Sequence, residues 1–112
     1  MRSSGSGAIR QVNPEFLPEA AAELDEAFEF YAGRFPRLGQ EFKAEARHAV
    51  DLVIEHPRAW KRVAPDLRQC KLNRFPYALV YGLDDDSVVI VAVAHLKKRP
   101  VYWRKRWRRR SS

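Results

Sequence analysis

A chain of 112 residues with 46% apolar side chains has room for one domain built around one hydrophobic core. Its longest apolar run, Val88–Ala94, is far shorter than the about 20 residues that span a bilayer, and no secretory signal is visible. The only cysteine, Cys70, excludes an internal disulfide and a cysteine-based zinc site. We therefore expect a soluble cytoplasmic protein that uses no metal and no cofactor, behind a flexible leader at residues 1–8.

The formal net charge of +7 is concentrated at the C-terminal end of the chain. Residues 97–112 contain nine basic side chains and no acidic one, whereas residues 1–96 contain 12 basic and 14 acidic side chains. A general nucleic-acid binder would spread its positive charge over a face or a groove. An anionic partner should instead meet this chain first at its C-terminal end.

The first predicted element is an edge strand at Ile9–Phe16, whose weak alternation includes a proline that only an edge or a bulge tolerates. A helix should follow, because Pro18 suits a first helical turn and apolar residues then recur at spacings of three and four. This helix should end near Arg34, because Pro36 disfavours helical geometry at the residue before it.

A second amphipathic helix is predicted after a turn at Pro36–Gly39, and it should end at His56-Pro57. The short connection makes the two helices an antiparallel hairpin. The pattern then changes, and three strands are predicted at Leu67–Asn73, Tyr77–Leu83 and Ser87–Ala94. The predicted fold class is α+β: an N-terminal edge strand and a helical hairpin packed on a mainly antiparallel sheet (β-α-α-β-β-β), with a basic C-terminal segment.

Short motifs occur along the chain in a characteristic order. They are Pro18-Glu19-Ala20, Phe30-Tyr31, His56-Pro57, Ala59-Trp60, Arg74-Phe75-Pro76-Tyr77, Leu79-Val80-Tyr81, Ala92-Val93-Ala94-His95 and Lys98-Arg99-Pro100. Together they resemble the RelE/ParE superfamily of bacterial toxins, and the ParE branch in particular. The resemblance extends from about Ile9 to Trp103, so we expect a toxin domain at residues 9–103 and a basic tail at 104–112.

The resemblance implies the toxin of a type II toxin–antitoxin system, which acts in the bacterial cytoplasm and is neutralised by a cognate antitoxin. Such a toxin would meet DNA only through the antitoxin complex and would not bind a membrane. ParE-like members inhibit DNA gyrase by binding to it, whereas RelE-like members cut messenger RNA on the ribosome. A third alternative is a member that has lost toxicity and remains an antitoxin-binding protein.

A ribonuclease needs a base for the 2′-hydroxyl, cations for the charged phosphorane and an acid for the leaving oxygen. The residues that could supply these groups are Arg68, Lys71, Arg74, His95 and Tyr102. However, RelE-like nucleases usually carry an arginine just after the aromatic residue of the strand that begins here at Tyr77, and this chain has Ala78. Alanine cannot stabilise a phosphorane, so we favour gyrase inhibition by binding over an enzymatic activity.

Each of these side chains also has a structural interpretation. His95 could be a capped residue at a strand end, and Arg68 and Arg74 could be ion-paired with carboxylates of the helices. Tyr77 and Tyr81 share a strand face and are expected to be packing residues.

The C-terminal segment alternates tryptophan with arginine. Trp103 and Trp107 are four residues apart, so in a helix they would share a face. The residues expected to bind a target or partner are Arg74, Lys97, Lys98, Arg99, Trp103, Arg104, Arg106 and Trp107. Alternatively, Trp103 packs on the core and the rest is solvated. We expect the body to fold without residues 104–112, unless the tail forms a helix that docks through Trp107.

Overall fold

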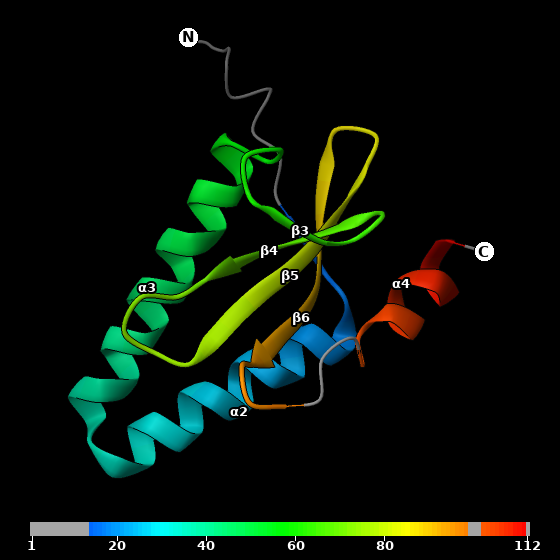
Figure 1. Ribbon diagram of the computed structural model, residues 1–112. Coiled ribbons are helices and arrows are strands. Elements are labelled where there is room, and N and C mark those ends of the chain that lie inside the picture. The colour runs from blue at the N-terminus through cyan, green and yellow to red at the C-terminus, as the bar shows by residue number, and fades with distance from the viewer. Residues whose placement is uncertain (1–13, 99–101, 112) are drawn as a thin grey trace, which may run out of the picture.

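The computed structural model describes residues 14–98 and 102–111, and its elements pack as a sheet between helices (Figure 1). The elements are, in chain order, β2 (Glu15–Phe16), α2 (Pro18–Arg34), α3 (Pro36–Glu55), β3 (Lys61–Ala64), β4 (Leu67–Lys71), β5 (Tyr77–Asp84), β6 (Ser87–His95) and α4 (Arg104–Ser111). Among the described helices, none combines the length and apolar character needed to cross a membrane.

The sheet has the strand order β2-β6-β5-β4-β3. Strand β2 runs parallel to β6 through the pairs Glu15–Val89 and Phe16–Ile90, and the other neighbours are antiparallel. The α+β class, the edge position of β2 and the mainly antiparallel sheet are therefore confirmed. Residues 9–13 of the expected first strand lie outside the described residues.

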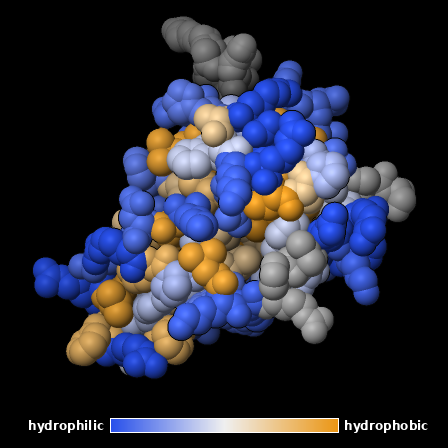
Figure 2. Space-filling model, viewed as in Figure 1, coloured by the Kyte–Doolittle hydropathy of each residue, from blue (hydrophilic) through white to orange (hydrophobic). Residues whose placement is uncertain are grey.

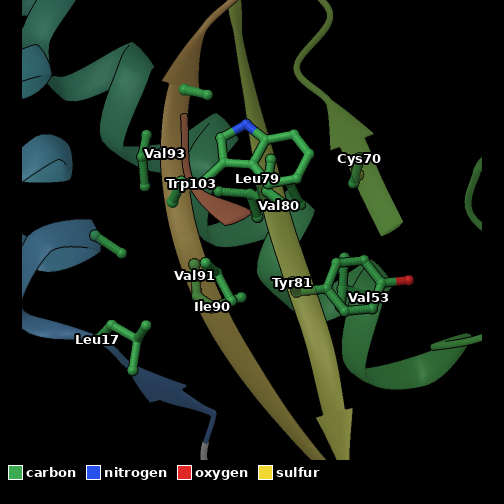
Figure 3. Packing of buried hydrophobic residues seen from close by; sticks show 14 of the residues in the cluster. Leu17, Val53, Cys70, Leu79, Val80, Tyr81, Ile90, Val91, Val93 and Trp103 are labelled. Atoms are coloured by element: carbon green, nitrogen blue, oxygen red, sulfur yellow. The ribbon is translucent and has the colours of Figure 1, made fainter. Parts of the chain in front are cut away.

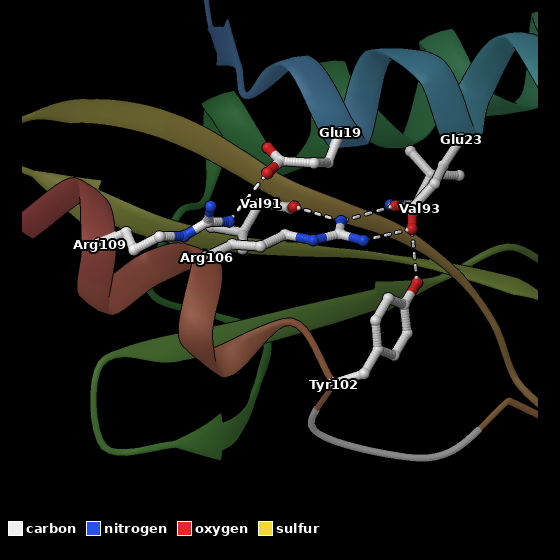
Figure 4. A network of polar contacts seen from close by, with 7 residues as sticks. All are labelled: Glu19, Glu23, Val91, Val93, Tyr102, Arg106 and Arg109. Carbon is white, nitrogen blue, oxygen red and sulfur yellow. Dashed lines mark hydrogen bonds and ion pairs between the residues drawn. The ribbon is translucent and has the colours of Figure 1, made fainter.

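The helical hairpin covers one face of the sheet, and α4 lies against the other (Figures 1 and 4). The alternation of side chains along β5 fits this arrangement. Leu79 lines a groove beneath α2 and α3, whereas the backbone of Gly82 faces the indole of Trp107 in α4. The sheet is therefore the middle layer, which explains why β5 and β6 are buried almost throughout.

The expected turn at Pro36–Gly39 is wrong, because α3 begins at Pro36 and a single residue, Phe35, connects the helices. Proline fits the first position of a helix, where its missing N–H would have no partner. Gly39 lies in the first turn of α3, where the helices cross closely. A Cβ at this position would lie 2.6 Å from the Cβ of Ala32, so a larger residue would force the helices apart.

The strands also differ in detail from the prediction. Strand β3, which pairs with β4, was not expected, and α4 adds a final element. Strand β4 ends at Lys71. The N–H of Leu72 still donates to the carbonyl oxygen of Tyr77 on β5 over 2.9 Å, and the ladder stops after it. The amides of Asn73 and Arg74 donate to the carboxylate of Glu45 on α3, the second over 3.1 Å. Strands β5 and β6 each extend one residue beyond the predicted end.

Most of the core lies between the hairpin and the two central strands, and Trp103 packs on the opposite face of these strands (Figure 3). Aromatic rings dominate the end near the hairpin loop, where Tyr31, Phe42 and Phe75 contact one another at centroid distances of 4.8 to 5.3 Å. Tyr81 is fully buried, and its hydroxyl donates to the carbonyl oxygen of Pro57 over 2.6 Å. Burial raises the pKa of Tyr81 to about 12, so this side chain stays protonated and structural.

Candidate functional site

An apolar groove of about 490 Å³ opens along the helical hairpin. Its floor and walls are apolar, and both helices contribute charged side chains to its lining. Asp25 and Glu29 come from α2, whereas Lys43 and Arg47 come from α3. The apolar residues that line it are Phe16, Leu24, Phe28, Phe42, Ala46, Val50 and Leu79. The groove thus has an apolar floor, with acidic side chains on one helix and basic side chains on the other. Such a groove suits an amphipathic segment of another chain.

On the other side of the molecule, α4 is joined to α2 by a compact polar network around Glu23 (Figure 4). The guanidinium of Arg106 donates to both carboxylate oxygens of Glu23, over 2.9 and 2.7 Å. The hydroxyl of Tyr102 donates to the same carboxylate over 2.8 Å, and the backbone N–H of Val93 donates over 3.0 Å. Arg106 also donates to the carbonyl oxygen of Val91 over 3.1 Å.

This network occupies the edge of β6 beyond the short β2. An edge strand exposes backbone groups with no ladder partner, and here Glu23 and Arg106 supply partners for Val93 and Val91. The two charged side chains are largely removed from water, with exposed fractions of 15% and 14%. The Glu23–Arg106 pair thus closes the sheet edge and connects the helices on opposite faces.

The pKa values of the network follow from these contacts. Burial acts to raise the pKa of Glu23, but hydrogen bonds from Arg106, Val93 and Tyr102 outweigh it and lower that pKa below its usual range. Burial and the hydrogen bond to Glu23 raise the pKa of Tyr102, and the hydrogen bond to Glu23 also raises the pKa of Arg106. The pair is therefore ionised at neutral pH, and Tyr102 holds its proton.

Helix α4 also docks through Trp107. The ring of this residue lies against Gly82 so closely that a Cβ there would be 2.6 Å from a ring carbon. Trp103, just before the helix, is buried in the core. Arg109 pairs with Glu19 over 2.8 Å. The segment expected as a basic tail is therefore a helix attached to the body, and Figure 2 shows hydrophilic side chains covering it at the right of the view.

The two expected nuclease arginines on β4 and after it are engaged in structural contacts. Arg74 is ion-paired with Glu41 of α3 over 2.6 Å, as the structural interpretation expects. Arg68 donates instead to the carbonyl oxygen of Trp60 over 2.8 Å. Lys71 is exposed at the end of β4. Neither arginine is directed at a site shared with Tyr102, whose hydroxyl points to Glu23.

His95 lies at the end of β6, where its Nδ1 accepts a hydrogen bond from the backbone N–H of Lys97 over 3.1 Å. Its ring packs edge-on against Tyr77 with centroids 5.0 Å apart. This is the capped strand-end residue of the structural interpretation. Lys97 and Lys98 are exposed, and Arg99 lies outside the described residues.

The expected partner-binding residues divide into two groups. Trp103, Arg106 and Trp107 attach α4 to the body, whereas the exposed ones are Arg74, Lys97, Lys98 and Arg104. The eighth, Arg99, lies outside the described residues. Glu23 was expected only as an acidic residue near the start of the first helix, and its role as the acceptor of the network was not predicted. Gly82 did carry a signal: a lone glycine inside a strand indicates close approach of another group.

The comparisons with known proteins agree with this architecture. The family model of the ParE toxin of type II toxin–antitoxin systems (parDE) matches residues 15–100, which include β2 to β6 and exclude α4. A solved structure described as the chromosomal ParDE TA system from P. aeruginosa superposes with a TM-score of 0.66. It is 17% identical, and the match covers 77% of this chain and 97% of that chain. No curated protein matches the chain in sequence.

Proposed function

The chain belongs to the family of ParE toxins of type II toxin–antitoxin systems, and from this premise we propose that it inhibits DNA gyrase by binding and is neutralised by a cognate antitoxin. We place this action in the bacterial cytoplasm, with DNA contacted only through the antitoxin complex. The observation that carries the proposal is the engagement of the potential nuclease groups, Arg74, His95 and Tyr102, in contacts within the fold.

The chemistry of these groups supports a binding inhibitor. A general acid must release its proton at the operating pH, yet the pKa of Tyr102 is raised by burial and by its hydrogen bond to Glu23. Ala78, at the position where RelE-like nucleases usually carry an arginine, is buried and offers no charge to a phosphorane. An inhibitor that acts by binding needs neither group.

The double substitution His95→Ala/Arg74→Ala tests this mechanism. A nuclease that loses an acid–base group and a phosphate cation should slow by at least about 10²-fold. We expect instead that the variant stays toxic and arrests DNA replication before translation, because gyrase inhibition by binding needs neither an acid–base group nor a phosphate cation. The measurement is a map of messenger RNA ends in cells that express either the wild type or the variant. Codon-phased cuts made by the wild type and absent from the variant would establish the ribonuclease instead.

We propose that the antitoxin binds in the apolar groove along the helical hairpin, between α2 and α3. Its apolar floor would be filled by apolar side chains of the antitoxin, and acidic residues beside them would meet Lys43 and Arg47 on α3. Such a segment would become ordered on binding, so most of the affinity should come from buried apolar contacts. The charged side chains of the groove would then fix the direction in which the segment lies.

Charge reversal at the groove, Lys43→Glu/Arg47→Glu, should weaken antitoxin binding by about tenfold or more, because like charges would then face each other. Both side chains are exposed, so the fold should be unaffected. The matched control is Lys61→Glu/Lys71→Glu, which changes the charge equally on exposed positions outside the groove. Pull-down with the product of the neighbouring gene measures the effect. Equal weakening by both variants would rule out a groove-specific contact. A chain that binds this product but is not toxic would favour the member that has lost toxicity.

A further inference from the structure

A second concave surface lies at the end of the sheet opposite the hairpin loop. This cleft has a volume of about 330 Å³ and is formed where the turn between β3 and β4 faces the last residues of β5 and the indole of α4. We call it the arginine cleft. Its lining residues that matter here are Arg58, Arg62, Asp66, Arg68 and Trp107.

The charge of the arginine cleft is predominantly positive. Arg58 precedes β3, Arg62 lies on β3 and Arg68 lies on β4, so three separate segments direct guanidinium-bearing side chains to one hollow. Within residues 14–98 and 102–111, none of the three has a carboxylate within ion-pair distance, although five other arginines do. Asp66 is the one acidic residue of the lining.

The wall opposite the arginines is aromatic and firmly positioned. Gly82 lets the ring of Trp107 approach the strand, and the Glu23–Arg106 pair fixes the helix that carries it. The same indole lines a smaller hollow of about 180 Å³, which adds Arg104 and Arg108. The ring therefore stands between two basic hollows that share Pro65, Asp66 and Leu67.

From this juxtaposition we propose that the arginine cleft binds a nucleotide unit, with its phosphate on Arg58, Arg62 and Arg68 and its base against Trp107. Guanidinium groups match phosphate oxygens in geometry and charge, and bases pack well on aromatic side chains. A cleft of about 330 Å³ is the size of a small-ligand site. The inference does not depend on gyrase as a target, because it rests on this cleft alone.

The bound nucleotide unit could be a free nucleoside triphosphate or part of a single-stranded nucleic acid. Two probes separate these sources: ATP, and a fluorescent ten-residue oligothymidine. Binding of the purified full chain is followed by fluorescence anisotropy at low and at physiological salt, with ATP as competitor. Displacement of the oligonucleotide by ATP at a comparable concentration assigns the free nucleotide, whereas displacement only by unlabelled oligonucleotide assigns the single strand.

The variant Arg58→Ala/Arg62→Ala should weaken binding by about tenfold or more and reduce the salt slope by up to about 0.7, the contribution of one phosphate contact in a single strand. Both side chains are exposed, so the melting temperature should not change. Arg34→Ala/Arg37→Ala, at the hairpin loop, removes the same charge away from the cleft and should have little effect. Trp107→Leu should weaken binding of the oligonucleotide. Binding of inorganic triphosphate, a probe that has no base, should stay nearly unchanged.

Three results would overturn the proposal. Equal weakening by the hairpin-loop control would show unspecific attraction to a basic protein. A decaglutamate peptide that binds as tightly, with the same dependence on Arg58 and Arg62, would make the cleft a site for an acidic protein segment. If neither ATP nor the oligonucleotide bound measurably at low salt, the arginine cleft would not be a nucleotide site.

Discussion

Glu23→Ala is expected to destabilise the protein by roughly 3–5 kcal/mol, the usual cost of removing one partner of a buried ion pair. The substitution would leave the guanidinium of Arg106, the hydroxyl of Tyr102 and the N–H of Val93 without their common acceptor. Thermal and urea unfolding would measure the loss. Glu26→Ala, an exposed position one turn further along α2, is the matched control and should change stability by less than about 0.5 kcal/mol.

The same carboxylate should make stability depend on pH in a defined direction. The pKa of Glu23 is lower in the folded chain than in the unfolded one, where it is about 4.3. Its contribution is therefore complete above that unfolded value and is lost as the pH falls through the folded pKa. The stability difference between the wild type and Glu23→Gln should be constant near pH 7 and shrink below about pH 4. A difference that grew in acid would contradict the ion pair.

The helices were predictable because their signals are local. Pro18 marks the start of α2, and each apolar stripe lies within one continuous segment. Pro36, interpreted from the sequence as part of a turn, is in fact the first residue of α3. The central strands β5 and β6 were predictable for the same reason, since apolar runs bury both faces. Strand β3 was missed because it is short and its first half is exposed, so hydrophobicity gives no signal; pairing with β4 stabilises it.

The polar network and the docking of α4 depend on contacts between residues far apart in the sequence. Glu23 and Arg106 are 83 positions apart, and no local pattern in the sequence pairs this glutamate with that arginine. The spacing of Trp103 and Trp107 did indicate a shared helix face. Trp107, however, packs against the backbone of Gly82, where the absence of a side chain leaves room for the ring. This contact exists only once the sheet is formed.

Truncation after Trp103 should therefore act mainly on stability. It removes Trp107 from Gly82 and leaves the Glu23 carboxylate in a partly buried position without Arg106. Loss of a fully buried aromatic side chain typically costs about 3–5 kcal/mol, so the partly buried Trp107 should contribute less, whereas loss of the ion-pair partner costs about 3–5 kcal/mol. The two effects share α4 and are not additive. A loss of about 5 kcal/mol would still lower the melting temperature of a domain of this size by roughly 20 °C or more.

A second variant separates this structural role from recognition by α4. Arg104→Ser/Lys105→Ser removes two exposed charges from the start of the helix but keeps Arg106 and Trp107 in place. We expect an unchanged melting temperature together with weaker binding to an anionic target. The weakening should be largest at low salt, because exposed charges are screened over about 8 Å at physiological ionic strength. If the truncated chain melted like the wild type, α4 would not be docked in solution, and its charges would have to act from a detached segment.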